Sequence, residues 1–337
     1  MTCKILCIQL KQIGDCLMTT PAVRALALAM PEAEIHYLTM RPSDQLFLEN
    51  GHVTKIHLYP KEESPRSLWK LISQLRAEKF EISIDFFGLP KTAILSRLIG
   101  AKKRIGYNYR GRAPFYTHAF TSPDRHPYAP FKKLELLEVL GIQSDDPQLE
   151  FPVSLKDQSY ATELLGSLSR QPERPLISIS PVSRQKYKVW PAQNFAFLAD
   201  RMMEEFQAQI LFLWGPGEEH FIAAVRSHMQ GKDLGDYEIP TIAETKAILE
   251  QVTLHLGNDN GPMHFAIAAQ TPSLAIFGRP MMENWTPPNS SRHRALEHDP
   301  GCKGKCNYPH CGLECLVDLT PERVWESLKK QLTKIID

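Results

Sequence analysis

The chain has 337 residues, of which 43% are hydrophobic and 23% charged, and its formal net charge is +1. This length suits two domains of about 150 to 170 residues, each large enough to bury a core without metals or disulfides. A charge so close to zero argues against a nucleic-acid partner and requires any anion site to be local. No run approaches the ~18 apolar residues of a membrane span, and the apolar run 4–10 lacks the features of a signal peptide, so we expect a cytoplasmic protein.

Short β-branched runs alternate with amphipathic stretches of helical length, a pattern typical of parallel sheets with crossover helices. We therefore predict an α/β protein with two doubly wound units. In the first half the expected strands are 4–10, 35–39, 53–59, 81–86 and 103–106, and the expected helices are 19–30, 66–79, 90–99 and 131–141. In the second half the expected strands are 176–180, 210–214, 252–257 and 273–277, and the expected helices are 192–206, 218–229 and 262–270.

Domain limits follow from the polar, proline-rich stretch 170–175, which is typical of a linker. We predict an N-terminal Rossmann-like domain at 1–165 and a second one at 175–318. The segment 319–337 is predicted to be a helix with Thr320 as N-cap and Pro321 at its first position, packing back toward the N-terminal domain.

The first motif, at 12–21, directly follows the first expected strand and contains Gly14 and Asp15. Ligands of doubly wound sheets bind outside the carboxyl ends of the strands, so Asp15 should point into a cleft between the two units. Gly14 gives this turn backbone freedom. The alternative is that Asp15 only caps the helix beginning near Leu17.

The second motif, at 180–191, follows the first strand of the second half and combines hydroxyl and cationic side chains, among them Ser183 and Lys188. Such a loop suits a diphosphate, because charge-assisted hydrogen bonds are strong. The alternative is a solvated basic loop that precedes a helix.

The third motif, at 257–266, ends a strand and begins a helix with Pro262 at its first position. The free N–H groups and the positive dipole end of that helix would form an anion site. Asp259 and Asn260 can fix the turn or bind hydroxyl groups, and His264 can face either the core or a phosphate. The alternative is an ordinary Asn/Asp-Gly turn with a helix cap.

Together these segments resemble glycosyltransferase family 9, the ADP-heptose:lipopolysaccharide heptosyltransferases. The resemblance rests on Gly-Asp-x-Leu-x-x-x-Pro from Gly14, Lys-x-Trp-Pro from Lys188 and Asp-x-Gly-x-x-His from Asp259. It extends to 99–107 and to Phe277-Gly278, so it spans nearly the whole chain.

The resemblance implies a GT-B fold, with two Rossmann-like domains facing a central cleft, the acceptor on the first and the donor on the second. It implies inverting transfer of a heptose or related sugar from an ADP-sugar to a lipopolysaccharide core, with no cofactor required for catalysis. The enzyme would act at the inner face of the cytoplasmic membrane, in peripheral contact with it. Asp15 would be the general base and Lys188 the diphosphate ligand. The other donor residues would be Ser183, Glu218, Asp259, Asn260, Gly261, Pro262, Met263, His264 and Gly278.

One departure from the family pattern follows the strand at 273–277. The family usually reads Phe-Gly-Pro-Thr there, whereas this chain has Arg279 and Pro280 after Gly278. The hydroxyl group that would help to bind phosphate is missing, and Arg279 can replace it with a charge.

Basic residues of the first half suit a docking surface for an anionic glycolipid, with a solvated face as the alternative. The residues assigned to the acceptor are Gly14, Lys102, Arg104, Arg110 and Arg112.

Four cysteines near the C-terminus form a further cluster with His298 and His310 beside it. Their spacing, Cys-x3-Cys-x4-Cys-x3-Cys, is compatible with structural zinc or iron, while a packing or redox role without metal is the alternative. A disulfide is disfavoured in the cytoplasm. These cysteines are Cys302, Cys306, Cys311 and Cys315.

Two other functions remain compatible with this sequence. One is a nucleotide-sugar-binding protein without turnover, and the other is a nucleotide-sugar epimerase. An epimerase needs acid and base groups near the sugar in the second domain, whereas the strongest candidate, Asp15, is in the first.

Overall fold

The computed structural model describes residues 3–279 and 281–336. The chain divides into two compact units, unit 1 from Met1 to Pro152 and unit 2 from Val153 to Asp337. Among the described residues, no helix is long and apolar enough to cross a membrane.

Unit 1 is built on a six-stranded parallel sheet in the order β3-β2-β1-β4-β5-β6. Because β1 lies in the middle and its neighbours follow outward on both sides, the sheet is doubly wound, as the sequence predicts. All pairs are parallel, so the carboxyl ends of the strands share one edge. The strands are β1 (Lys4–Ile8), β2 (Glu34–Thr39), β3 (Lys55–Leu58), β4 (Ile82–Asp85), β5 (Lys103–Tyr107) and β6 (His118–Phe120).

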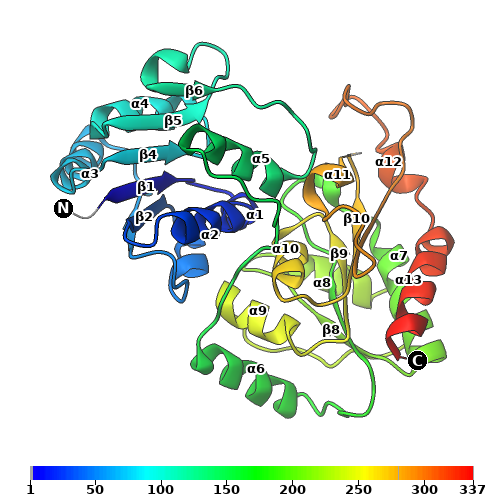
Figure 1. Cartoon of the computed structure of the whole chain (residues 1–337). Coiled ribbons are helices and arrows are strands. Elements are labelled where there is room, and N and C mark those ends of the chain that lie inside the picture. Colours follow the sequence, from blue (N-terminus) through cyan, green and yellow to red (C-terminus); the bar gives the residue numbers. More distant parts are fainter. Residues whose placement is uncertain (1–2, 280, 337) are drawn as a thin grey trace. The chain divides into compact units, whose positions relative to one another are not determined.

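The helices of unit 1 cover both faces of this sheet (Figure 1). Leu71, Leu75 and Ile99 of α3 and α4 pack on Leu6 and Ile8 of β1. Pro65 begins α3, where the side chain of Ser64 accepts the Ser67 N–H at 3.1 Å, so cap chemistry sets this start. The helices are α1 (Ile13–Leu17), α2 (Thr20–Ala29), α3 (Pro65–Ala77), α4 (Pro90–Ile99) and α5 (Ala129–Glu135), with short 3₁₀ turns η1 (Ser43–Phe47), η2 (Ala113–Phe115) and η3 (Leu136–Leu140).

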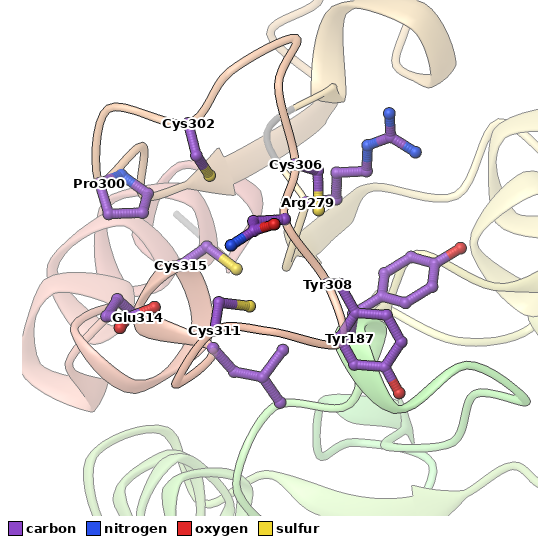
Figure 2. A pocket seen from close by; sticks show the side chains of 11 residues that line it. Tyr187, Arg279, Pro300, Cys302, Cys306, Tyr308, Cys311, Glu314 and Cys315 are labelled. Atoms are coloured by element: carbon purple, nitrogen blue, oxygen red, sulfur yellow. The ribbon is translucent and has the colours of Figure 1, made fainter.

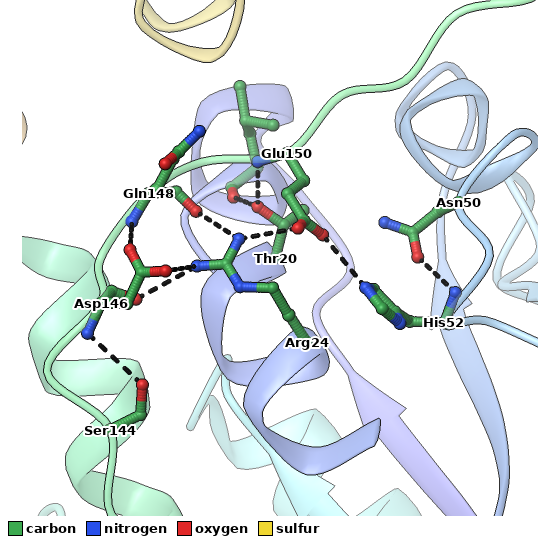
Figure 3. Close-up of polar contacts among 9 residues, drawn as sticks. Thr20, Arg24, Asn50, His52, Ser144, Asp146, Gln148 and Glu150 are labelled. Carbon is green, nitrogen blue, oxygen red and sulfur yellow. Dashed lines mark hydrogen bonds and ion pairs between the residues drawn. The ribbon is translucent and has the colours of Figure 1, made fainter. Parts of the chain in front are cut away.

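Arg24 of α2 fixes the last segment of unit 1 (Figure 3). Its guanidinium group donates to Gln148 O at 3.0 Å and to Glu150 Oε1 at 2.7 Å, and it pairs with Asp146 Oδ2 at 2.9 Å. The hydroxyl of Thr20 accepts the Glu150 N–H at 2.9 Å. These bonds join the end of unit 1 to the helix that follows the Asp15 turn.

Unit 2 has a five-stranded parallel sheet in the order β11-β10-β9-β7-β8. It is also doubly wound, because the chain moves outward from β7 to β8 and then returns to β9 on the other side. The strands are β7 (Leu176–Ser180), β8 (Gln209–Phe212), β9 (Leu254–Asn258), β10 (Ser273–Phe277) and β11 (His293–Glu297).

Helices α7, α8 and α13 share one apolar core with this sheet. Trp190 is its largest fully buried side chain, and the indole Nε1 donates to Leu319 O at 2.9 Å. The helices are α6 (Leu155–Ser167), α7 (Ala192–Phe206), α8 (Glu219–Arg226), α9 (Ile242–Leu249), α10 (Gly261–Ala268), α11 (Met282–Trp285), α12 (Glu314–Val317) and α13 (Pro321–Ile336), with a 3₁₀ turn η4 (Lys186–Lys188).

The division between the units lies earlier than the predicted linker at 170–175. The reason is α6, which sequence periodicity does not reveal and which packs on α9 within unit 2. The last helix begins at Pro321 as predicted, and its residues Val324, Trp325 and Leu328 belong to the core of unit 2.

Candidate active site

Three loops of unit 2 leave the carboxyl ends of β7, β9 and β10, which are neighbours in the sheet. The backbone N–H of Trp190, in the loop after β7, donates to Asn258 Oδ1 at 3.2 Å. Asn260, in the loop after β9, donates from Nδ2 to Ser180 O, Ser180 Oγ and Val182 O at 3.2, 2.9 and 3.0 Å. The second and third motifs therefore form one polar surface at the edge where doubly wound sheets bind ligands.

Lys188 and Asp259 form an ion pair across these two loops, with Nζ 2.6 Å from Oδ2. The lysine side chain is about one quarter exposed and the aspartate side chain 10% exposed. The cation is thus held at the protein surface by a nearly buried carboxylate and is able to turn to an anionic ligand.

Asn260 is the N-cap of α10, and its Oδ1 accepts the Met263 N–H at 3.2 Å. The cap therefore uses the Met263 N–H, so this donor of the first helical turn is not free for an anion. Pro262 has no N–H, so Gly261 supplies the next donor of the first helical turn. Both polar ends of Asn260 are engaged within the protein, which favours the turn-fixing role over contact with hydroxyl groups of a ligand.

His264 lies in the first half of α10 and is 5% exposed, so it belongs mainly to the core. Burial lowers the pKa of His264 to about 4, with Asp259 acting in the opposite direction, and the ring is neutral near pH 7. Its Nδ1 is buried with no hydrogen-bond partner in the structure. Its ring centroid is 6.1 Å from that of Trp285.

The remaining donor-side residues line the same edge in different ways. The Oγ of Ser183, itself nearly buried, accepts the Gln185 N–H at 3.3 Å. Glu218 is the N-cap of α8 and accepts the Gly215 N–H at 2.9 Å. Gly278 follows β10, and a Cβ there would lie 1.9 Å from the carbonyl oxygen of Tyr187, so only glycine fits against the turn that carries Lys188.

In unit 1, the carboxyl end of β1 leads into α1, which contains both Gly14 and Asp15. The Asp15 carboxylate accepts the backbone N–H of Gln12 at 3.1 Å through Oδ2. Asp15 is therefore at the third position of this short helix, with Gln12 as N-cap. Asp15 thus takes part in helix capping, but in a helix that begins at Ile13 and not near Leu17.

A partly buried cation lies near Asp15 and belongs to no recognisable motif. Lys133 of α5 donates from Nζ to Phe86 O at 2.6 Å and lies 5.6 Å from the ring centroid of Tyr107. Burial lowers the pKa of Lys133, while the carboxylates of Asp15 and Asp85 act in the opposite direction. Only the topology brings α5 to the carboxyl ends of β1 and β4, so no local signal marks this lysine.

Asp85 ends β4 and is fully buried. It accepts the N–H groups of Phe87 and Gly88 at 3.0 Å each and the hydroxyl of Tyr116 at 2.7 Å. The ring of Tyr116 lies on Gly106, where a Cβ would be 2.3 Å from it. Burial raises the pKa of Asp85 and these hydrogen bonds oppose the change.

The basic residues assigned to the acceptor are split between the two ends of β5. Lys102 precedes the strand and pairs with Glu81 at 2.7 Å, and Arg104 donates to Ala101 O and Phe115 O at 2.9 and 3.1 Å. Arg110 and Arg112 follow the strand, with the guanidinium group of Arg112 5.8 Å from the ring centroid of Tyr109. Only Arg110 and Arg112 therefore share the sheet edge of Asp15.

Two groups of side chains could hold a metal ion. In the described parts of the chain, only His36, His57 and Glu78 have three candidate ligand atoms within 4.8 Å of one another. They already have other partners, because His36 Nδ1 is 3.0 Å from His57 Nε2 and Glu78 pairs with Lys4 and Lys55. The second group is the four cysteines, which line one cavity of unit 2 (Figure 2).

Comparisons with known proteins agree with this architecture. The family model described as "Glycosyltransferase family 9 (heptosyltransferase)" matches residues 68–313. The chain is 25% identical over 289 residues to lipopolysaccharide heptosyltransferase 3 of Escherichia coli, covering 81% of this chain and 83% of that one.

Solved structures show the same fold. A family 9 glycosyl transferase from Veillonella parvula superposes with a TM-score of 0.83 at 22% identity, covering 98% of this chain and 97% of that one. The E. coli heptosyltransferase WaaC with ADP-2-deoxy-2-fluoro heptose superposes with a TM-score of 0.72 at 17% identity, covering 97% of this chain and 99% of that one. The two Rossmann-like units thus correspond to a GT-B fold.

Proposed function

The chain belongs to glycosyltransferase family 9, and we propose on that basis that it moves heptose from ADP-heptose to a lipopolysaccharide core acceptor. The sugar and the acceptor are suggested by the names of its relatives, a lipopolysaccharide heptosyltransferase and a heptosyltransferase bound to an ADP-heptose analogue. The observation that carries the proposal is the ion pair of Lys188 and Asp259 beside the N-terminus of α10, where a diphosphate can replace the carboxylate as partner of the lysine.

Unit 2 binds the donor in this proposal. Lys188 and the Gly261 N–H meet the diphosphate, and the positive end of the α10 dipole adds to the attraction. Asp259 holds Lys188 at the loop edge until the diphosphate takes its place, so the cation is already close by when charge develops on the leaving ADP. Ser183, Glu218 and Gly278 belong to the same sheet edge and complete the donor side.

Unit 1 binds the acceptor and supplies the base. The acceptor hydroxyl oxygen forms a bond to the anomeric carbon while the bond from that carbon to the ADP oxygen breaks. The hydroxyl proton moves to the Asp15 carboxylate, whose position at a sheet edge supports this role. Attack opposite to the leaving group inverts the anomeric carbon. No metal takes part in the proposed steps.

Arg110 and Arg112 receive the anionic groups of the acceptor, because they share the sheet edge of Asp15. Lys102 and Arg104 are left out of this role, since they lie at the other end of β5 and are engaged with Glu81, Ala101 and Phe115. A glycolipid acceptor would bring the enzyme to the inner face of the cytoplasmic membrane.

A donor screen tests the proposal. The purified protein is incubated with a heptose-deficient lipopolysaccharide core and with ADP-heptose, UDP-N-acetylglucosamine or GDP-mannose in turn. We expect release of the nucleotide diphosphate only with ADP-heptose, as ADP, with no UDP or GDP from the other two donors, together with a mass gain of one heptose on the acceptor. An isomerised nucleotide sugar without acceptor would instead support an epimerase, and ADP binding without release would support a binding protein.

A further inference from the structure

The loop between β11 and α12 carries three cysteines, and α12 carries the fourth. The Asp299 Oδ1 accepts the N–H groups of Gly301, Cys302 and Lys303 at 2.9, 3.0 and 3.1 Å, which makes a tight turn at the first cysteine. A second turn follows, in which the His310 N–H donates to Asn307 O at 2.7 Å. These turns bring a loop with little regular structure back on itself.

All four cysteine side chains line one cavity of about 280 Å³ (Figure 2). Each is a free thiol. Cys315 belongs to the core of unit 2, whereas Cys311 is exposed, so the cavity runs from the core to the surface.

Four thiols that line one cavity supply the donor set of zinc and iron sites, in which sulfur ligands of this number are common. Metal–sulfur bonds of about 2.3 Å in a tetrahedron require sulfur–sulfur distances of about 3.8 Å. In the structure no three of these described sulfurs lie within 4.8 Å of one another, so binding would draw the loop inward.

The cavity also reaches the donor loop. Tyr187 and Tyr308 line it, with ring centroids 5.1 Å apart. Tyr187 precedes Lys188 in the turn η4, and its carbonyl group is packed on Gly278. A change in the cysteine loop therefore bears on the segment that positions Lys188.

We propose that Cys302, Cys306, Cys311 and Cys315 bind one zinc or iron ion as thiolates, and that this ion holds the loop whose Tyr308 supports Tyr187 beside Lys188. The ion has a structural role: it is bound by deprotonation of the thiols and takes no part in sugar transfer. The support of Tyr187 beside Lys188 rests on the proposed function, because it concerns the loop assigned to ADP.

Metal content tests the site without reference to transferase activity. Zinc and iron are measured by elemental analysis in protein purified without added metal, and we expect about one equivalent of one of the two. The double variant Cys306→Ser/Cys311→Ser removes two thiols that are not part of the core of unit 2, and it leaves the core residue Cys315 in place. This variant should lose the ion. Cys3→Ser, at a partly exposed free thiol of unit 1, is the matched control and should keep it.

Cobalt gives a second measurement that does not depend on the native metal. Protein stripped by chelator and reloaded with Co²⁺ should show sulfur-to-cobalt charge-transfer absorption, and the double variant should not. Absence of both metals and of this absorption, or a mass corresponding to disulfide-paired cysteines, would overturn the site.

Calorimetry with ADP tests the link to the donor loop. Stripped wild-type protein should bind ADP more weakly than metal-loaded protein, with recovery on reloading. Equal ADP affinity in both forms would refute the link while leaving the metal site intact, and failure of all forms to bind ADP would count against the proposed function instead.

Discussion

Lys188 and Asp259, which are 71 positions apart in the chain, are joined by an ion pair of 2.6 Å between two loops. The lysine is therefore positioned before any ligand arrives. The aspartate does this at a cost, since an anionic ligand must compete with it for the same ammonium group.

Lys188→Ala should weaken ADP binding about ten- to hundredfold, since it removes a charge-assisted bond of about 1.5 to 3 kcal/mol. It also leaves the Asp259 carboxylate without its cation close to the phosphates. Isothermal titration calorimetry measures the effect. Lys186→Ala, at an exposed position of the same turn, is the control and should bind as wild type does. Unchanged affinity in Lys188→Ala would remove the lysine from the donor site.

Asp15→Asn should lower turnover about 10²- to 10⁴-fold and leave ADP affinity nearly unchanged, because the amide cannot accept the proton. A purely capping residue would respond differently, since Asn can still accept the Gln12 N–H. Asp157→Asn is the matched control: Asp157 also accepts an N-cap N–H, from Ser154 at 3.0 Å, at the start of α6. Full activity in a folded Asp15→Asn protein would show that the base lies elsewhere.

Lys133→Met should shift the acid limb of the kcat/KM profile to higher pH, because a cation near the Asp15 carboxylate favours its ionised form. We regard Lys133 as a positioning residue that acts through Asp15. Lys133→Arg should restore much of the wild-type profile, as it keeps the charge. A Met variant with reduced activity but an unmoved profile would indicate only lost packing.

Arg110→Gln/Arg112→Gln should raise the KM for the acceptor and leave the KM for the donor nearly unchanged, since two cations beside the acceptor are removed. Lys102→Gln/Lys103→Gln removes the same charge at the opposite end of β5 and serves as control. Steady-state kinetics with each substrate varied in turn distinguish the two pairs. An effect confined to the donor constant would contradict the assignment.

The free energy of unfolding should fall as the pH drops from about 6.5 toward 4. Burial lowers the pKa of His264 to about 4 and that of His255 to about 3, whereas both titrate near 6.5 in the unfolded chain. The unfolded state therefore binds protons first on acidification, and each histidine contributes on the order of 3 kcal/mol to this loss.

Urea unfolding across this pH range measures that slope. The His255→Asn variant should show a shallower change of the free energy of unfolding with pH, whatever the stability of this variant at neutral pH. The control variant His118→Asn, at an exposed position of unit 1, should keep the wild-type slope. An identical slope in His255→Asn would mean that this histidine does not titrate on unfolding.

The sequence predicts elements whose signals are local. Strand 176–180 and helices 90–99 and 192–206 have the predicted bounds, because apolar periodicity and a proline or glycine at their ends define them. Helix α6 was missed, since its apolar face is narrow and its partner α9 comes some 80 positions later. Strand β11, at the sheet edge and only partly buried, gives no strong apolar run either.

The residues of the candidate site also differ in whether a local sequence pattern marks them. Asp15, Lys188 and Asp259 follow strands and carry recognisable motifs, so position and residue type were enough to single them out. Lys133 and the split of the basic residues along β5 depend on which strand ends meet, which is decided by tertiary packing. The use of the Met263 N–H by Asn260 depends on one side-chain rotamer, which no sequence pattern fixes.

The assignment of α6 to unit 2 affects how the ADP-binding half should be isolated. Ala161 and Leu165 of this helix are buried, and Thr162 accepts a hydrogen bond from Gln251 at 3.0 Å just beyond α9. A recombinant fragment that starts at the proline-rich stretch near 175 would lack α6, expose the apolar surface of α9 that this helix covers, and invite aggregation. One that starts at Val153 and keeps α13 would retain the whole core, giving a smaller protein for nucleotide titrations and inhibitor screening.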